Sequence, residues 1–310
     1  MILLWGDFAD RPLNSVMGSL KENTSADLVV VDQKRSSEIE IEMKVSDGIS
    51  GYIQIGDRYY SLADITSAYL RPYGGSGPDD GTSDASTGHD LCRHGLELEQ
   101  VLTSWVDMTP ALVINRFAAM ASNGSKPYQA SIIKKYGFKT PATIISNTPD
   151  EVRDFCRRQG QVIYKSISGV RSIVARLTRE KMKHIDDIIW APTQFQQYVR
   201  GTDIRVHVIG GKTICSEIIS DADDYRYAAR TGNDLKISAC DIPAEQKIKC
   251  IELVKDLGLA VGGVDLRLTP DGEWYCFEVN PSPGFTYYQS HTGQDIAAEI
   301  ADLLVHPSGN

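Results

Sequence analysis

The stretch GGVDLRLTPDGEWYCFEVNPSPG, residues 262–284, decides the fold of this chain. Two alternating runs flank a Pro-Asp-Gly turn signal, which predicts a β-hairpin. A two-residue turn at Asp271-Gly272 would place Asp265 directly across from Glu278, and a four-residue turn would keep the same faces. One face then carries Asp265, Arg267, Cys276, Glu278 and Asn280, and the other carries Val264, Leu266, Leu268, Tyr275, Phe277 and Val279.

The polar face of this hairpin predicts a metal site. Carboxylates and an amide oxygen, here from Asp265, Glu278 and Asn280, suit Mg²⁺, with nucleotide phosphates and water completing the shell. Two acids facing each other across strands repel, and a cation removes that conflict. The alternative is a solvated polar face on which Arg267 pairs with an acid.

Four further segments precede the hairpin. A helix with Pro127 near its start and a strand bearing Lys165 are predicted, followed by a glycine-containing turn and a hairpin turning at Gly210-Gly211. The segments are SKPYQASIIKKYGFKTPAT (125–143), VIYKSISG (162–169), TQFQQYVRGTDIRVHVIGGK (193–212) and DADDYR (221–226).

In this order, and with VDLRL and FEVNP, these segments resemble the ATP-grasp superfamily over roughly residues 110–305. The likeness is greatest for the branch of microviridin-type macrocyclases and ribosomal-protein glutamate ligases, and the N-terminal ITSAYLRP (65–72) also looks like the macrocyclases. One departure concerns the substrate. Those macrocyclases carry a longer strand and hairpin between the strand lysine and the hinge, where a leader peptide docks. The corresponding segment here, from Lys165 to Gln194, is short.

The resemblance implies ATP and Mg²⁺ as cofactors and gives side chains their roles. Asp265, Glu278 and Asn280 would hold the metal. Lys126 and Lys165 would contact ATP phosphates, with the backbone of Ser168 and Gly169 close to them. The adenine hinge would be Gln196, Gln197, Tyr198 and Val199, with Asp203 at the ribose. Arg205 and Arg226 would stabilise the transition state, and Arg267 would hold an acyl phosphate.

Each of these roles has a plainer alternative. Lys165 can reach water along its strand, and Lys126 can be a solvated helix start. The Ser168-Gly169 pair can be an ordinary turn, the hinge an edge strand, and the arginines partners in ion pairs. His184, His207 and His291 show no metal or triad spacing and are expected to be packed or exposed.

The implied fold class is α/β (α+β), an ATP-grasp fold that clasps ATP between two sheets. We expect an N-terminal pre-ATP-grasp or substrate subdomain (1–112), a central subdomain (113–192) and a C-terminal subdomain (193–306) with the metal site. Residues 74–90 are rich in Gly, Ser and Asp. They predict a mobile surface loop, either a plain linker or a lid.

The amino-acid composition and the net charge limit the classes of molecule that the protein is expected to bind. The 310 residues carry a formal charge of -9, which disfavours nucleic acid and anionic membranes. Six cysteines without a C-x-x-C pair predict reduced thiols rather than zinc ligands. No run approaches the roughly 20 apolar residues of a membrane span. A cytoplasmic protein is expected, and a homodimer is left open.

Four functions remain open at this point. The first is an ATP-dependent ligase that activates a carboxylate as an acyl phosphate and joins it to an amine or hydroxyl. The second is a ribosomal-peptide macrocyclase that forms ester or amide crosslinks. The third is an ATP-grasp kinase. The fourth is a silent nucleotide-binding module, which the complete set of Asp265, Glu278 and Asn280 argues against.

Overall fold

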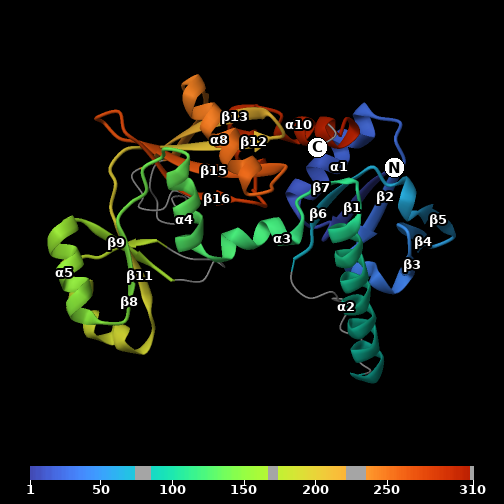
Figure 1. Ribbon diagram of the computed structural model, residues 1–310, viewed down its shortest axis with the longest axis horizontal. Helices are drawn as coiled ribbons and strands as arrows, with labels where there is room; N and C mark the ends of the chain where they lie inside the picture. The colour runs from blue at the N-terminus through green and yellow to red at the C-terminus, as the bar shows by residue number, and fades with distance from the viewer. Residues whose placement is uncertain (74–84, 167–173, 221–234, 308–310) are drawn as a thin grey trace.

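The computed structural model describes residues 1–73, 85–166, 174–220 and 235–307, with the backbone alone for 85–92. Within these ranges the strands form four sheets. Figure 1 shows the sheet of β8, β9 and β11 as a lobe with helix α5, away from the N-terminal sheet. The described helices include none with the length and apolar character needed to cross a bilayer.

The N-terminal sheet is parallel, with strand order β2-β1-β6-β7. Asp10 caps the helix that follows β1, because its Oδ2 accepts a hydrogen bond from the Leu13 N–H at 3.1 Å. The strands are β1 (Ile2–Gly6), β2 (Leu28–Asp32), β6 (Ser67–Arg71) and β7 (Leu112–Ile114), and the helices are α1 (Arg11–Asn23) and α2 (Ala85–Met108), with short 3-10 turns at Gln33–Glu38 and Leu62–Asp64.

The expected loop over 74–90 is wrong for its last six residues, 85–90, because α2 begins at Ala85. Its composition favoured a loop, but composition alone does not exclude the start of a helix. Residues 74–84 lie outside the described residues.

A small antiparallel sheet of β3 (Ile39–Val45), β4 (Ile49–Ile55) and β5 (Arg58–Ser61) follows β2. Gly56 and Asp57 form the two-residue turn between β4 and β5, because Ile55 pairs with Arg58. Gly56 has a φ of 58°, a conformation that glycine adopts without steric cost.

The central sheet has the order β10-β9-β11-β8. Strand β11 pairs with both β8 and β9, so it belongs to this sheet and lies beyond the expected division at residue 192. The division into three subdomains otherwise stays a prediction. The elements are β8 (Thr143–Ser146), α5 (Pro149–Gln159), β9 (Val162–Lys165), β10 (Ala175–Arg176), α6 (Arg179–Met182), the 3-10 segment Ile185–Trp190 and β11 (Thr193–Gln197).

The C-terminal sheet is antiparallel, with the order β14-β13-β12-β15-β16. The predicted turn at Gly210-Gly211 is confirmed by the pairing of Ile209 with Lys212. Its elements are β12 (Thr202–Ile209), β13 (Lys212–Ser220), β14 (Leu235–Cys240), α8 (Ala244–Asp256), β15 (Val261–Leu268), β16 (Trp274–Asn280), α9 (Thr286–Thr292) and α10 (Ile296–Val305), and α3 (Phe117–Met120), the turn Ala121–Gly124 and α4 (Lys126–Lys135) lead into the central sheet.

The apolar clusters of the core do not coincide with the individual sheets. One cluster joins Ile2 and Leu4 of β1 to Ile209 of β12 and to Ile300 and Leu304 of α10. A separate small cluster, which includes Val152 and Phe195, belongs to the central sheet. The N-terminal and C-terminal sheets are therefore held by shared apolar packing, while the central sheet has a core of its own.

Asn115 fixes the end of β7 to the start of β15. Its Oδ1 accepts from the Ala260 and Val261 N–H groups at 2.8 and 3.2 Å. Its Nδ2 donates to the Val261 and Pro281 carbonyls at 2.7 and 2.6 Å. The side chain is 3 % exposed, so these backbone groups have no ready access to water.

Asn115→Ala is therefore expected to lower the free energy of unfolding by about 3 kcal/mol, since it leaves buried backbone groups unpaired. The shift in the urea midpoint measures this loss. Asn23→Ala is the matched control, because the side chain of exposed Asn23 bonds, within the described parts of the chain, to Ser19 of its own helix alone. Equal midpoints for the two variants would contradict the assignment.

Candidate active site

The hairpin of β15 and β16 has the predicted Asp265–Glu278 pair, but two residues of β16 lie on the side opposite to the prediction. The turn is one residue longer than expected, since Thr269 and Glu273 bond to each other across it. A bulge between Asp265 and Leu266 shifts the register back. Asp265 therefore lies opposite Glu278, as predicted.

On β16, the residues between the turn and the bulge face the opposite way from the prediction, while Leu266 of β15 keeps its predicted apolar side. Leu266 pairs with Cys276 and Arg267 with Tyr275. Cys276 is 0 % exposed and belongs to the apolar core, so placing it on the acidic face was wrong. Placing Tyr275 with the apolar residues was also wrong. Phe277 is the additional residue of the bulge.

The polar face of the C-terminal sheet is ordered in rows across its strands. One row runs Ser216, Arg205, Asp265, Glu278 over β13, β12, β15 and β16. The next row places His207, Gly263 and Asn280 side by side. Since Glu278 and Asn280 are two residues apart on one strand, their side chains share this face with Asp265.

Arg205 is a buried cation in the centre of the first row. Its Nη1 donates to Asp265 Oδ1 at 2.5 Å, and its side chain is 5 % exposed against 25 % for Asp265. A Cβ on Gly263 would lie 2.3 Å from Nη2 of Arg205, so the guanidinium rests on bare backbone. The ring centroid of Tyr288 is 5.6 Å from Cζ. Arg205 is thus held beside the acids rather than in solvent.

His207 shares the strand face of Arg205 and is 0 % exposed. Burial, helped by the charge of Arg205, lowers the pKa of His207 well below its usual value. Its ring meets Tyr288 edge to face at a centroid distance of 5.0 Å. The imidazole is therefore packed in the interior, which is one of the two outcomes expected from the sequence.

Arg267 binds Asp203 and the hinge. Its Nε and Nη2 donate to the two oxygens of Asp203, each at 2.7 Å. Its Nη1 donates to the Val199 carbonyl at 2.7 Å. The ion-pair alternative is thus observed, with Asp203 rather than a metal-site acid as the partner. The roles of Arg267 at an acyl phosphate and of Asp203 at a ribose stay predictions.

The predicted hinge connects the central sheet to the C-terminal sheet. The Gln197 N–H donates to the Ala142 carbonyl at 2.8 Å, and its side-chain Oε1 accepts from the Ala142 N–H at 3.3 Å. The Tyr198 N–H donates to the Gln161 carbonyl at 2.9 Å. Gln196, 7 % exposed, donates to Thr143 Oγ1 at 3.1 Å. These hydrogen bonds fix the position of the strand that, by the family resemblance, is predicted to bind adenine.

The two lysines that are predicted to contact ATP phosphates lie on different elements. Lys165 ends β9 and pairs with Gln194 of β11, one strand away from the hinge residues. Lys126 begins α4, three residues before Gln129 and thus on the same helical face. Gln129 exchanges hydrogen bonds of 2.8 and 2.9 Å with the backbone of Val279, which separates Glu278 from Asn280. Lys126 therefore lies on the helix face whose Gln129 contacts β16, and its role at ATP phosphate stays a prediction.

Ser168, Gly169 and Arg226 lie outside the described residues, so their roles stay predictions. Among the residues that the structure does describe, five cysteines are free. Burial raises the pKa of Cys215 and of Cys250 to about 12 each, so these thiols stay protonated.

The oxygen atoms of Asp265, Glu278 and Asn280 fit a Mg²⁺ site. All three residues are partly exposed and lie on one sheet face. The donor set is all oxygen, which is what Mg²⁺ prefers, and it is too sparse to close the shell, which leaves room for phosphate and water. Arg205 balances one of the two negative charges in the unliganded protein.

A model of the RimK-like ATP-grasp domain matches residues 91–304. The chain belongs to the RimK-like ATP-grasp family. The ATP-grasp fold expected from the sequence is thereby confirmed. ATP-grasp ligases use ATP with Mg²⁺, which agrees with the expected cofactors.

Curated relatives of this RimK-like chain are named probable alpha-L-glutamate ligase. The one from Vibrio cholerae is 29 % identical over 201 residues, which cover 61 % of this chain and 66 % of the relative. The one from Teredinibacter turnerae is 26 % identical over 209 residues, which cover 64 % and 68 %. The chain thus spans about two thirds of the length of these relatives.

Solved structures resemble the RimK-like chain over nearly its whole length. The ATP-grasp ligase PsnB, complexed with a phosphomimetic variant of its minimal precursor, Mg and ADP, has a TM-score of 0.79 at 24 % identity and 98 % and 97 % coverage. The macrocyclase MdnC from Microcystis aeruginosa, bound with precursor peptide MdnA, has 0.79 at 20 % and 98 % of both chains. A RiPP-associated ATP-grasp ligase from Chryseobacterium gregarium has 0.82 at 21 %, with 99 % and 97 % covered.

The sequence interpretation missed several residues that build this RimK-like site. Gln129 and Asn115 are buried amides whose partners are backbone groups about 150 residues away, which no local pattern reveals. Arg71, in contrast, could have been identified from the sequence. An arginine that ends a buried strand is rarely left without a buried partner.

Proposed function

We propose that this protein is an ATP-dependent ligase that activates a carboxylate as an acyl phosphate and joins it to an amine or hydroxyl, releasing ADP and phosphate. The observation that carries the proposal is the row Arg205, Asp265, Glu278 beside Asn280. It sets an oxygen donor set and a buried guanidinium on one sheet face, as phosphoryl transfer requires.

The reaction has two balanced steps. A substrate carboxylate oxygen bonds to the γ-phosphorus of ATP as the β–γ bridging bond breaks, which gives an acyl phosphate and ADP. An amine or hydroxyl then bonds to the acyl carbon, phosphate leaves, and the nucleophile releases its proton. No protein nucleophile takes part.

The residues contribute by holding charge in place. Asp265, Glu278 and Asn280 would hold Mg²⁺, which neutralises phosphate charge when bound. Arg205, fixed by Asp265 and by the bare backbone of Gly263, presents a preorganised cation. Lys126 and Lys165 would neutralise the remaining phosphate charge, and the strand 196–199 would receive the adenine.

The second candidate is a macrocyclase that links side chains within a ribosomal peptide. Its support is the fold likeness to PsnB and MdnC over 98 % of this chain, N-terminal sheet included. A short acidic precursor rich in Ser, Thr and Lys beside the gene would favour it over a ligase that acts on an amino acid or a protein tail.

One experiment separates these candidates from a kinase. The protein is incubated with ATP, Mg²⁺ and a panel of amino acids, glutamate-ended peptides and neighbouring gene products, and ADP release and product mass are followed. A ligase joins two molecules with loss of one water, and a macrocyclase removes water from a single peptide. A product that retains phosphate would overturn both.

A further inference from the structure

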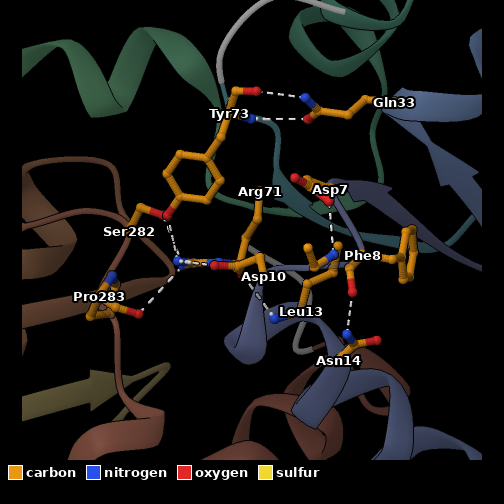
Figure 2. A network of polar contacts seen from close by, with 11 residues as sticks. Asp7, Phe8, Asp10, Leu13, Asn14, Gln33, Arg71, Tyr73, Ser282 and Pro283 are labelled. Carbon is orange, nitrogen blue, oxygen red and sulfur yellow. Dashed lines mark hydrogen bonds and ion pairs between the residues drawn. The ribbon is translucent and has the colours of Figure 1, made fainter. Parts of the chain in front are cut away.

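Arg71 is a buried cation at the carboxyl end of β6, where the N-terminal sheet meets the C-terminal part of the chain. It is 4 % exposed. Its Nε and Nη2 donate to the two oxygens of Asp10, the latter bond at 3.4 Å. Nη2 also donates to Tyr73 Oη at 2.5 Å, and Nη1 donates to Ser282 Oγ at 2.9 Å and the Pro283 carbonyl at 3.4 Å. Figure 2 shows this convergence.

Every N–H of the guanidinium therefore has an acceptor. The acceptors come from three separate parts of the chain: the cap of α1, Tyr73 two residues after β6, and the segment that follows β16. A planar guanidinium group whose N–H donors are all hydrogen-bonded is held in a single orientation. Arg71 thus fixes the segment of Ser282 and Pro283 against the N-terminal sheet.

That segment leads directly to the metal residues. The Ser282 N–H donates to Asn280 Oδ1 at 2.9 Å. This bond turns the oxygen of the amide, rather than its NH₂, toward the chain, and leaves the second lone pair of Oδ1 for a cation. From the other side of the segment, Asn115 donates to the Pro281 carbonyl at 2.6 Å. Of the three proposed metal residues, Asn280 is the one for which the described contacts include a hydrogen bond from this segment.

We propose that Arg71 is a positioning residue for the metal site: through Ser282 it holds the Asn280 amide oxygen in place for Mg²⁺. The inference rests on the proposed function, because it takes Asn280 as a metal ligand. Groups that orient a metal ligand commonly change metal affinity 10- to 100-fold when they are removed.

The test uses the full chain and the fluorescent nucleotide mant-ADP. Binding is titrated against Mg²⁺, and the melting temperature is measured without ligand. The variants are Arg71→Lys, which keeps the charge and loses the fork, and Ser282→Ala, which removes only one acceptor. Arg116→Lys is the matched control, since Arg116 is also a part-buried guanidinium but bonds to carbonyls of Val106, Thr109 and Ala111.

For Arg71→Lys we expect the Mg²⁺ concentration at half-maximal mant-ADP binding to rise about 10-fold, and for Ser282→Ala about 3-fold. Arg116→Lys should lower the melting temperature and leave the Mg²⁺ midpoint within twofold of wild type. Unchanged midpoints in Ser282→Ala and in folded Arg71→Lys would overturn the inference. Nucleotide binding by the wild type that ignores Mg²⁺ would instead contradict the proposed function.

Discussion

Replacing Glu278 with glutamine is expected to lower ATP turnover about 10³-fold and to leave the stability of the protein nearly unchanged. Within the described residues Glu278 forms no ion pair, and it lies directly opposite Asp265. The substitution keeps the shape of the side chain but removes one of the two negative charges that would bind Mg²⁺. Removal of that charge also relieves cross-strand repulsion, so unfolding should not become easier.

The measurement is ADP release at saturating ATP, with urea unfolding in parallel. Glu273→Gln is the matched control: the same hairpin carries this glutamate, which pairs with Lys139 at 2.5 Å on the surface. Its turnover should stay within twofold of wild type. If Glu278→Gln retained a tenth or more of the activity, the metal role of β16 would have to be abandoned.

Asp265→Asn is expected to abolish turnover and also to lower the free energy of unfolding by about 3 kcal/mol. The second effect arises because Asp265 is the anionic partner of Arg205, whose side chain is 5 % exposed. Removing the carboxylate leaves that positive charge in a poorly solvated place.

A double-mutant cycle with Arg205→Met tests this explanation. Arg205→Met should destabilise less than Asp265→Asn, because the carboxylate left behind is 25 % exposed. The double variant should recover much of the lost stability while turnover stays absent. If the effects of the two substitutions on unfolding simply added, the pair would not be the source of the instability.

The metal hairpin was predictable because alternation and one turn signal determine it. The Asp265–Glu278 pair was right, although the turn has one residue more than expected. The bulge that compensates for it leaves no mark in the alternation, and so the positions of Tyr275 and Cys276 could not be read correctly.

Contacts between strands that are far apart along the chain could not be predicted from the sequence. Arg205 and Asp265 are 60 residues apart, and Arg267 and Asp203 are 64 apart. From residue types alone, each arginine could form an ion pair with several acidic residues. The order of strands β12, β15 and β16 in the sheet determines which acidic residue each arginine contacts. Family resemblance supplied the hinge and the lysines, whose roles composition and spacing leave open.

The core shared by the two ends of the fold has a consequence for biosynthesis. Ile2 and Leu4 are covered by Ile300 and Leu304, and the buried Ser67 hydroxyl donates to the Leu304 carbonyl at 2.6 Å. During translation, this side of the first sheet is therefore only partly covered, by α1, until α10 has left the ribosome. The nascent chain exposes apolar strands for almost the entire synthesis, which makes this sheet the place where chaperones would be needed.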